Sequence, residues 1–154
     1  METQPLKPMS GAPVPLFDRL ADSQPNASWE QVPLRILDRD GLIASITREA
    51  HRLVNTRAPE PMSQWPHTPR TVMNYGIPDF THLSPQNGSH VAQLAELIAH
   101  AIECYEPRLR EVKLSPAQDQ TPHESFSYHV QALLVVGSVT EPISFPLAPG
   151  PTPF

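Results

Sequence analysis

The most constraining feature of this sequence is a change in the spacing of its apolar residues at Pro107. Before it, apolar side chains recur every three or four residues behind the candidate N-cap Ser89, the pattern of one helical stripe. The stripe consists of Val91, Leu94, Ala95, Ile98, Ala101, Ile102 and Tyr105. After Pro107 the period is two, with Arg108, Arg110, Val112 and Leu114 expected on one face and Leu109, Glu111 and Lys113 on the other. The sequence therefore predicts a helix that Pro107 ends and that passes directly into a strand.

Two more strands are predicted after this one. Residues 125–137 alternate and are apolar on both faces in their second half, which is typical of a central strand. The side chains expected on one face are Phe126, Tyr128, Val130, Ala132, Leu134 and Val136. In "EPISFPLAP", Ile143, Phe145 and Leu147 share a face, and Pro146 cannot donate to a ladder. The last strand therefore belongs at the edge of the sheet.

An earlier helix is predicted from Asp38 onwards. Its apolar residues recur at three- and four-residue steps from Leu42 to Val54, behind the candidate caps Asp38 and Asp40, and it must stop before Pro59. Residues 70–80 indicate a short strand entering a turn. The fold class is α+β: a small antiparallel or mixed sheet packed against two main helices.

The ends of the chain are rich in proline, which accounts for many of the 20 prolines. We expect residues 1–15 to form a flexible leader, 16–148 the domain, and 149–154 a disordered tail. Within the domain, "PLFDRLAD" (15–22) has the spacing of a short helix. It either docks on another protein or caps the domain's own core. Its side chains Leu16, Phe17, Asp18, Arg19 and Leu20 are candidate binding residues in the first case.

Composition limits the partners and the compartment. A formal net charge of -5 gives no reason to expect nucleic acid or an anionic membrane as partner. The longest apolar run, residues 132–136, is far too short to span a bilayer, so we expect no membrane insertion. The lone Cys104 cannot form an internal disulfide, and its place in the helical pattern suggests a thiol at least half-buried in a reducing compartment. The cytoplasm fits best.

The search for catalytic or cofactor chemistry gives weak candidates. His100 and Cys104 lie four residues apart on the second helix, but two ligands do not make a zinc site. The sequence has no GxSxG, CxxC or glycine-rich phosphate loop. The acidic pairs at 38 and 40 and at 103 and 106 are explained by capping and exposure, and aromatic platforms for glycan are scarce. We expect no metal, no cofactor and no enzymatic activity.

Glu106-Pro107-Arg108 allows two interpretations. One is a helix stop with a surface ion pair contributing about 0 to 1 kcal/mol. The other is a binding surface, because Arg108 begins a strand on the side that further along is core, and Pro107 limits how far it can move from Glu106.

Five stretches together resemble one family: "PLFDRL" (15–20), "RILDRDGL" (35–42), "LVNTR" (53–57), "VMNYGIPDF" (72–80) and "YEPRL" (105–109). In this order they resemble the TssE family of baseplate wedge subunits of bacterial type VI secretion systems. That family is related to a wedge protein of contractile phage tails, and older naming calls its relatives lysozyme-like. The resemblance implies a non-enzymatic, cytoplasmic part of a contractile injection machine. It also implies that Glu106, Pro107 and Arg108 carry the family's signature motif.

The partners that the resemblance implies are the wedge proteins TssF, TssG and TssK and the sheath proteins TssB and TssC. The sequence itself offers a route, because an edge strand carrying Ile143 and Phe145 can accept a strand from another protein. We therefore expect a subunit that links the wedge to the sheath and nucleates sheath assembly. The alternatives are a small scaffold or binding domain unrelated to secretion and a peptidoglycan hydrolase.

Overall fold

The computed structural model describes residues 12–13, 36–65, 70–117 and 125–150, and the chain divides into two compact units, 1–46 and 47–154. The predicted helix at 15–22 lies outside the described residues, as do most of the predicted leader and tail. Their boundaries stay predictions. No helix in the described part of the chain has the length and apolar character needed to cross a bilayer.

In the first unit, β1 (Ala12–Pro13) pairs antiparallel with β2 (Ile36–Leu37). Helix α2 (Arg39–Val54) begins here and continues into the second unit. The Gly41 N–H donates to Asp38 Oδ1 at 2.8 Å, and the Leu42 N–H donates to the Asp38 carbonyl at 2.9 Å. Asp38 therefore caps α2 as predicted, whereas Asp40 lies inside its first turn.

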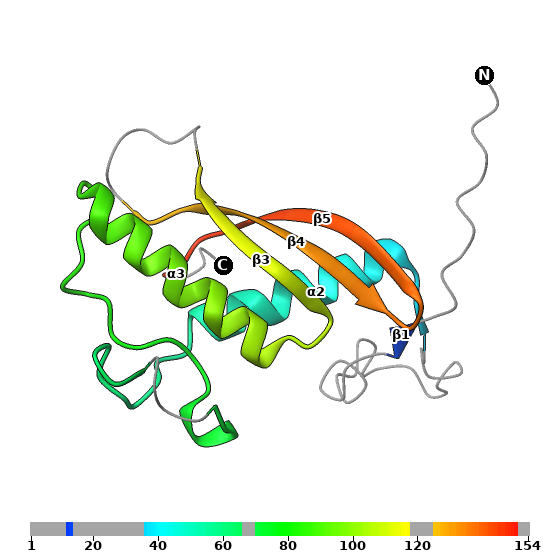
Figure 1. Ribbon diagram of the computed structural model, residues 1–154, viewed down its shortest axis with the longest axis horizontal. Coiled ribbons are helices and arrows are strands. Elements are labelled where there is room, and N and C mark those ends of the chain that lie inside the picture. Colours follow the sequence, from blue (N-terminus) through cyan, green and yellow to red (C-terminus); the bar gives the residue numbers. More distant parts are fainter. Residues whose placement is uncertain (1–11, 14–35, 66–69, 118–124, 151–154) are drawn as a thin grey trace, which may run out of the picture. The chain divides into compact units, whose positions relative to one another are not determined.

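The second unit contains an antiparallel sheet in the order β3-β4-β5, whose strands run side by side in Figure 1. Its members are β3 (Leu109–Pro116), β4 (Tyr128–Val136) and β5 (Val139–Leu147). Helix α3 (Gly88–Tyr105) packs beside β3. The predicted α+β class is confirmed, and among the described strands β4 is central and β5 lies at the edge, as predicted.

The core of this unit is formed by the apolar stripe of α3 and the inward face of the sheet. The Tyr128 hydroxyl on β4 donates to the Val91 carbonyl on α3 at 3.0 Å, which ties the helix to that face. Every second side chain is buried from Tyr128 to Leu134 of β4 and in the second half of β5, as the period of two predicts, whereas Val136 at the end of β4 is only half-buried. The buried strand residues are Leu109, Val112, Tyr128, Val130, Ala132, Leu134, Ile143, Phe145 and Leu147.

The predicted faces of β3 are wrong at its start. Leu109 is fully buried and Arg110 is exposed, whereas the alternation put Arg110 on the core side. The cause is a β-bulge between Arg110 and Lys113, where β3 has one residue more than β4. Glu111 takes a positive φ of 52° at this point. The extra residue resets the alternation, so Leu109 and Val112 face the core although they are three apart.

Three other expectations need correction. Residues 70–80 hold no strand beyond one isolated bridge between Arg57 and Ile77; instead Val72–Asn74 forms a 3-10 helix, η2. A capping box explains it, because Thr71 and Asn74 satisfy each other's backbone and side-chain groups. The N-cap of α3 is Asn87, whose side chain accepts from the Ser89 N–H, so Ser89 is not the cap. Cys104 is exposed, because it lies beside the apolar stripe of α3 instead of within it.

Candidate functional site

The helix-to-strand corner at Glu106-Pro107-Arg108 is held by a chain of backbone hydrogen bonds. The Glu106 N–H donates to the Ile102 carbonyl at 2.8 Å and closes the last turn of α3. The Glu106 carbonyl then accepts the Leu109 N–H at 3.0 Å, which makes a tight turn with Pro107 in the position that proline favours. The Arg108 carbonyl accepts the Val135 N–H of β4 at 2.8 Å. The sheet therefore begins as soon as the turn ends.

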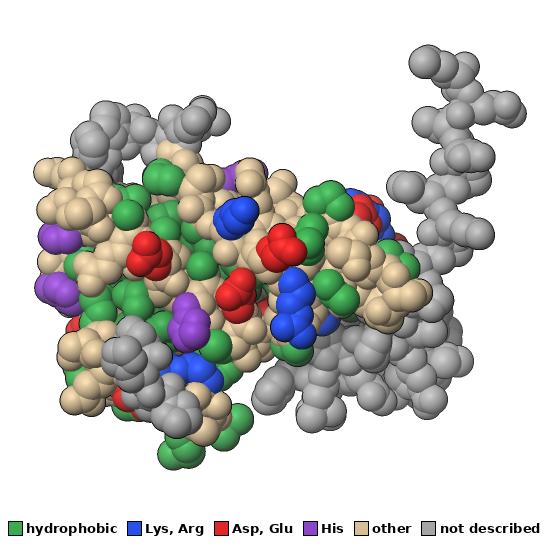
Figure 2. Space-filling model, in the orientation of Figure 1, with side chains coloured by type: hydrophobic (Ala, Val, Ile, Leu, Met, Phe, Trp, Pro, Cys, Tyr) green, Lys and Arg blue, Asp and Glu red, His purple; other side chains and the backbone are tan. Residues whose placement is uncertain are grey.

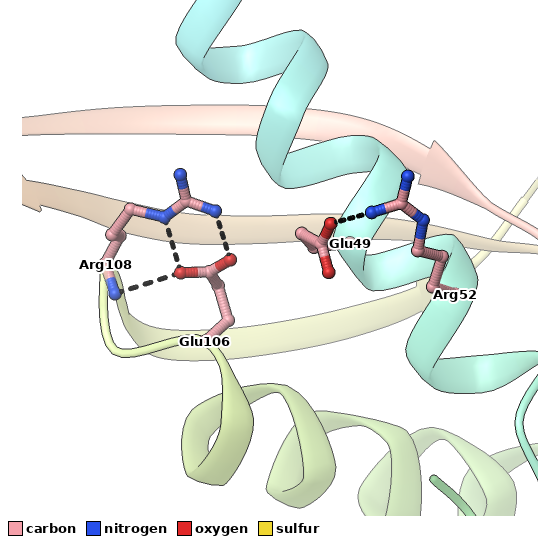
Figure 3. A network of polar contacts seen from close by, with 4 residues as sticks. All are labelled: Glu49, Arg52, Glu106 and Arg108. Atoms are coloured by element: carbon pink, nitrogen blue, oxygen red, sulfur yellow. Dashed lines mark hydrogen bonds and ion pairs between the residues drawn. The ribbon is translucent and has the colours of Figure 1, made fainter. Parts of the chain in front are cut away.

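The side chains of this corner form a bidentate ion pair, shown in Figure 3. Arg108 Nε donates to Glu106 Oε1 at 2.7 Å, Arg108 Nη2 donates to Oε2 at 2.6 Å, and the Arg108 N–H adds a third bond to Oε1 at 3.2 Å. The Glu106 side chain is only 8% exposed and the Arg108 side chain 19%. The pair is neither a surface ion pair nor a free guanidinium reaching outward; both charges are satisfied within the chain.

A second ion pair lies beside the first. Figure 3 shows Glu49 and Arg52 on α2, joined one helical turn apart, near the Glu106–Arg108 pair. Tyr75 lies within electrostatic reach of both pairs. Burial raises the pKa of its hydroxyl, the Glu49 and Glu106 carboxylates raise it further, and Arg52 opposes them. Sequence reasoning missed these neighbours, because they come from segments far from the corner.

The loops that carry "LVNTR" and "VMNYGIPDF" are joined directly. The Ile77 N–H donates to the Thr56 carbonyl at 3.0 Å, and the Ala58 N–H donates to the Ile77 carbonyl at 2.8 Å. Gly76 permits this approach: its φ is +114°, and a Cβ there would lie 2.3 Å from the Thr56 oxygen. Arg57 adds an ion pair with Asp79 at 2.5 Å.

Tyr105 connects the third stretch, "YEPRL", to the same loops. Its hydroxyl lies 2.7 Å from the Asn74 carbonyl and 3.1 Å from the Thr71 carbonyl. Its ring meets the Tyr75 ring edge-on, with centroids 5.1 Å apart. Three of the five stretches that carry the family resemblance therefore meet in one place. This meeting is a scaffold of hydrogen bonds and ion pairs.

The arrangement is suited to holding a shape. No three His, Cys, Asp or Glu side chains cluster at metal-binding distance among the described residues. Cys104 Sγ lies 3.7 Å from His100 Nε2. Although the residue as a whole is exposed, partial burial of its thiol raises the pKa of that thiol, which disfavours the thiolate that a metal or a nucleophilic reaction needs.

The outer edge of β5 is the second part of the candidate site. Ile143 and Phe145 are buried, so their side chains face the core and not a partner. Proline is tolerated in a strand where its nitrogen points away from the ladder. The backbone groups of Pro142 and Pro146, which oppose Leu133 and His129 of β4, therefore face away from β4. Because this direction alternates along a strand, every second residue of β5 in step with these prolines also faces outward. These residues are Thr140, Pro142, Ser144 and Pro146.

Comparisons with known proteins give one family match and one similar solved structure. A family model described as "Baseplate wedge protein gp25" matches residues 40–138. Among solved structures, a chain from "The baseplate complex from the type VI secretion system" is similar, with 18% identity and a TM-score of 0.48, covering 73% of this chain and 97% of that one. No significant match was found among curated proteins. The family match includes the corner and ends just before β5.

Proposed function

Because this chain belongs to the baseplate wedge protein gp25 family, we propose that it is a structural, non-enzymatic baseplate component of a type VI secretion system. The observation that carries this proposal is the family match over residues 40–138. The role is that of a TssE-type wedge subunit in the cytoplasm, with TssF, TssG and TssK as partners. The resemblance in the five sequence stretches supports the same assignment.

The finer part of the proposal is that the subunit links the wedge to the sheath proteins TssB and TssC and nucleates sheath assembly. Its support is the sheet edge: among the described strands, β5 pairs with β4 and with no other. An added strand would find four outward carbonyls but only two outward N–H groups, from Thr140 and Ser144, since Pro142 and Pro146 have none. Strand addition at this edge therefore offers about six backbone hydrogen bonds.

The energetics favour a nucleator over a tight binder. About six hydrogen bonds at roughly 0.5 to 1.5 kcal/mol each contribute about 3 to 9 kcal/mol. Ordering a flexible partner strand costs about 2 to 5 kcal/mol, so one strand addition is marginal. Copies arranged around a ring raise one another's effective concentration, which makes the assembled ring stable when a single contact is not.

The Glu106–Arg108 pair contributes to the proposed function by fixing where the sheet begins. It fixes the turn from which β3 starts, and the Arg108 carbonyl begins the ladder with β4, which in turn supports β5. The corner then aligns the sheet edge for the sheath.

Ser144 provides the test of strand addition. Ser144→Pro removes an outward N–H and places a ring in the path of an incoming strand, while Pro142 and Pro146 on either side show that this strand accepts proline at alternate positions. We expect a folded protein that no longer supports sheaths, seen by imaging a fluorescent sheath subunit in cells that carry the variant. Ser144→Ala keeps the N–H and is the matched control. Full-length sheaths with Ser144→Pro would refute strand addition.

The segment "PLFDRL", with Leu16, Phe17, Asp18, Arg19 and Leu20, remains a proposed docking helix for the wedge subunits and lies outside the described residues. Deleting residues 1–22 should reduce co-purification with the wedge proteins. Undiminished co-purification would remove this hypothesis and leave the baseplate assignment untouched.

A further inference from the structure

Val72 and Met73 are exposed far beyond what is usual for large aliphatic side chains. They are 88% and 82% exposed; the next such side chain in the described part of the chain, Val139, is 40% exposed. Both lie side by side on η2, so together they form a protruding apolar tip, which we call the Val72–Met73 knob. Apolar side chains that are scattered singly on a surface need no explanation, whereas adjacent ones exposed to this extent indicate an interaction site.

The backbone under the knob is rigid. The Thr71 N–H donates to Asn74 Oδ1 at 2.8 Å, and the Met73 N–H donates to Thr71 Oγ1 at 3.2 Å. The Asn74 side-chain amide donates to Glu60 Oε1 at 2.8 Å, and Tyr105 binds the carbonyls on both sides of the knob. A tip held in one conformation loses little entropy when it is bound. The joined loops of the candidate site therefore present two apolar side chains in a fixed position.

The charges around the knob indicate the chemistry of its partner. Arg70 lies over the Trp65 ring at 4.2 Å and donates to the Trp65 carbonyl, and Glu60 accepts from Asn74. Arg70 and Glu60 thus each have a partner within the chain. On the face shown in Figure 2, acidic, basic and apolar side chains of the described residues are interspersed. The chain also has a net charge of -5, so this tip has no electrostatic attraction to an anionic bilayer.

We propose that the Val72–Met73 knob inserts into an uncharged apolar pocket on another wedge subunit of the baseplate, an inference that rests on the proposed function. A convex two-residue tip requires a concave partner, and engaged charges at its base require a partner without a compensating charge at the pocket rim. This contact is separate from the β5 edge, so one subunit would use the knob for the wedge and the edge for the sheath.

The test is binding of the full-length chain to a purified complex of the TssF-type and TssG-type subunits encoded with it. Val72→Ser and Met73→Ser together should weaken the Kd at least about tenfold, because central apolar anchors dominate the affinity of protein interfaces. The thermal midpoint should not change, because both side chains are exposed. Val139→Ser, a matched change at another exposed aliphatic residue, should leave the Kd unchanged.

Each outcome separates the two proposals. If the wild-type chain binds and the double variant binds equally well, the knob inference is overturned and the baseplate assignment stands. If the wild-type chain does not bind the complex, the proposed function fails and the knob inference fails with it. Concentration-dependent self-association that the double variant abolishes would show that the knob binds a second copy of the chain. Binding of the knob to vesicles of anionic phospholipid would show that it binds a membrane. Either result would overturn the inference.

Discussion

Replacing Arg108 by Met tests whether the corner pair stabilises the fold. The change removes two charge-assisted hydrogen bonds, of 2.7 and 2.6 Å, from a carboxylate that is only 8% exposed. Removing one partner of a buried pair destabilises by about 3 to 5 kcal/mol because the other charge is left buried and alone. Arg108 itself is 19% exposed, so water can reach part of the site. We therefore expect a loss of about 2 to 4 kcal/mol in the free energy of unfolding.

Urea denaturation at pH 7 measures this loss. With an m-value of about 2 kcal/mol/M, a loss of about 3 kcal/mol lowers the midpoint by about 1.5 M. The matched control is Arg52→Met, which breaks the neighbouring pair with Glu49, where the side chains are 50% and 25% exposed. That change should alter stability by less than about 1 kcal/mol.

A double variant, Arg108→Met with Glu106→Leu, separates the orphaned charge from the packing of the corner. Since replacing both members of a buried pair is often neutral, most of the lost stability should return. Ordinary surface changes alter the free energy of unfolding by about 0.5 kcal/mol or less. If Arg108→Met alone changes it by no more than this, the pair does not stabilise the corner. If the single change is severe and the double variant does not recover, desolvation of Glu106 is not the cause. Either result refutes the reasoning from burial.

Two further predictions concern the loops and the tyrosines. Gly76→Ala places a Cβ 2.3 Å from the Thr56 oxygen at a φ of +114°, so it should destabilise by more than about 2 kcal/mol, whereas Gly137→Ala, at φ +59° with open space around it, should lose only about 1 to 2 kcal/mol in the same urea assay. The chain has three tyrosines, and burial raises the pKa of each hydroxyl in the fold. Because the folded state favours the neutral phenol, this stabilisation is present below the unfolded pKa of about 10 and is lost as the pH rises above it. Absorbance at 295 nm should therefore show tyrosine ionising together with alkaline unfolding; normal titration of all three near pH 10 with the fold intact would contradict the burial.

The regular elements of the second unit could be predicted because burial imposes a period on the sequence. The stripe of α3, the stop at Pro107 and the inward faces of β4 and β5 all follow from one face being in the core. The bulge at Glu111 could not be predicted, because it is a backbone event with no matching side-chain pattern. The turn at η2 did leave a signal, the Thr71-to-Asn74 spacing of a capping box, but the β-branched residues around it favoured a strand.

The candidate site was predictable only in its local part. Glu106 and Arg108 are two residues apart, so the sequence could suggest that they pair, and they do. Their burial depends on segments that approach from elsewhere, as does the contact of Tyr105 with the loop at Asn74. Contacts of this kind are set by tertiary packing. For the same reason the sequence could not distinguish a surface ion pair from a buried one.

The two edges of the sheet differ, and this difference gives the proposed assembly a direction. On β3, the Val112 N–H is already bound by Glu103 Oε1 of α3 at 3.1 Å, and the bulge disturbs the ladder at that point. On β5, the outward carbonyls and the N–H groups of Thr140 and Ser144 face away from β4. Among the described strands, β5 therefore offers an edge for the proposed strand addition, whereas β3 offers no regular register. A subunit with one open edge can start an open polymer but cannot extend it from both sides, which is the property that a nucleator of a sheath requires.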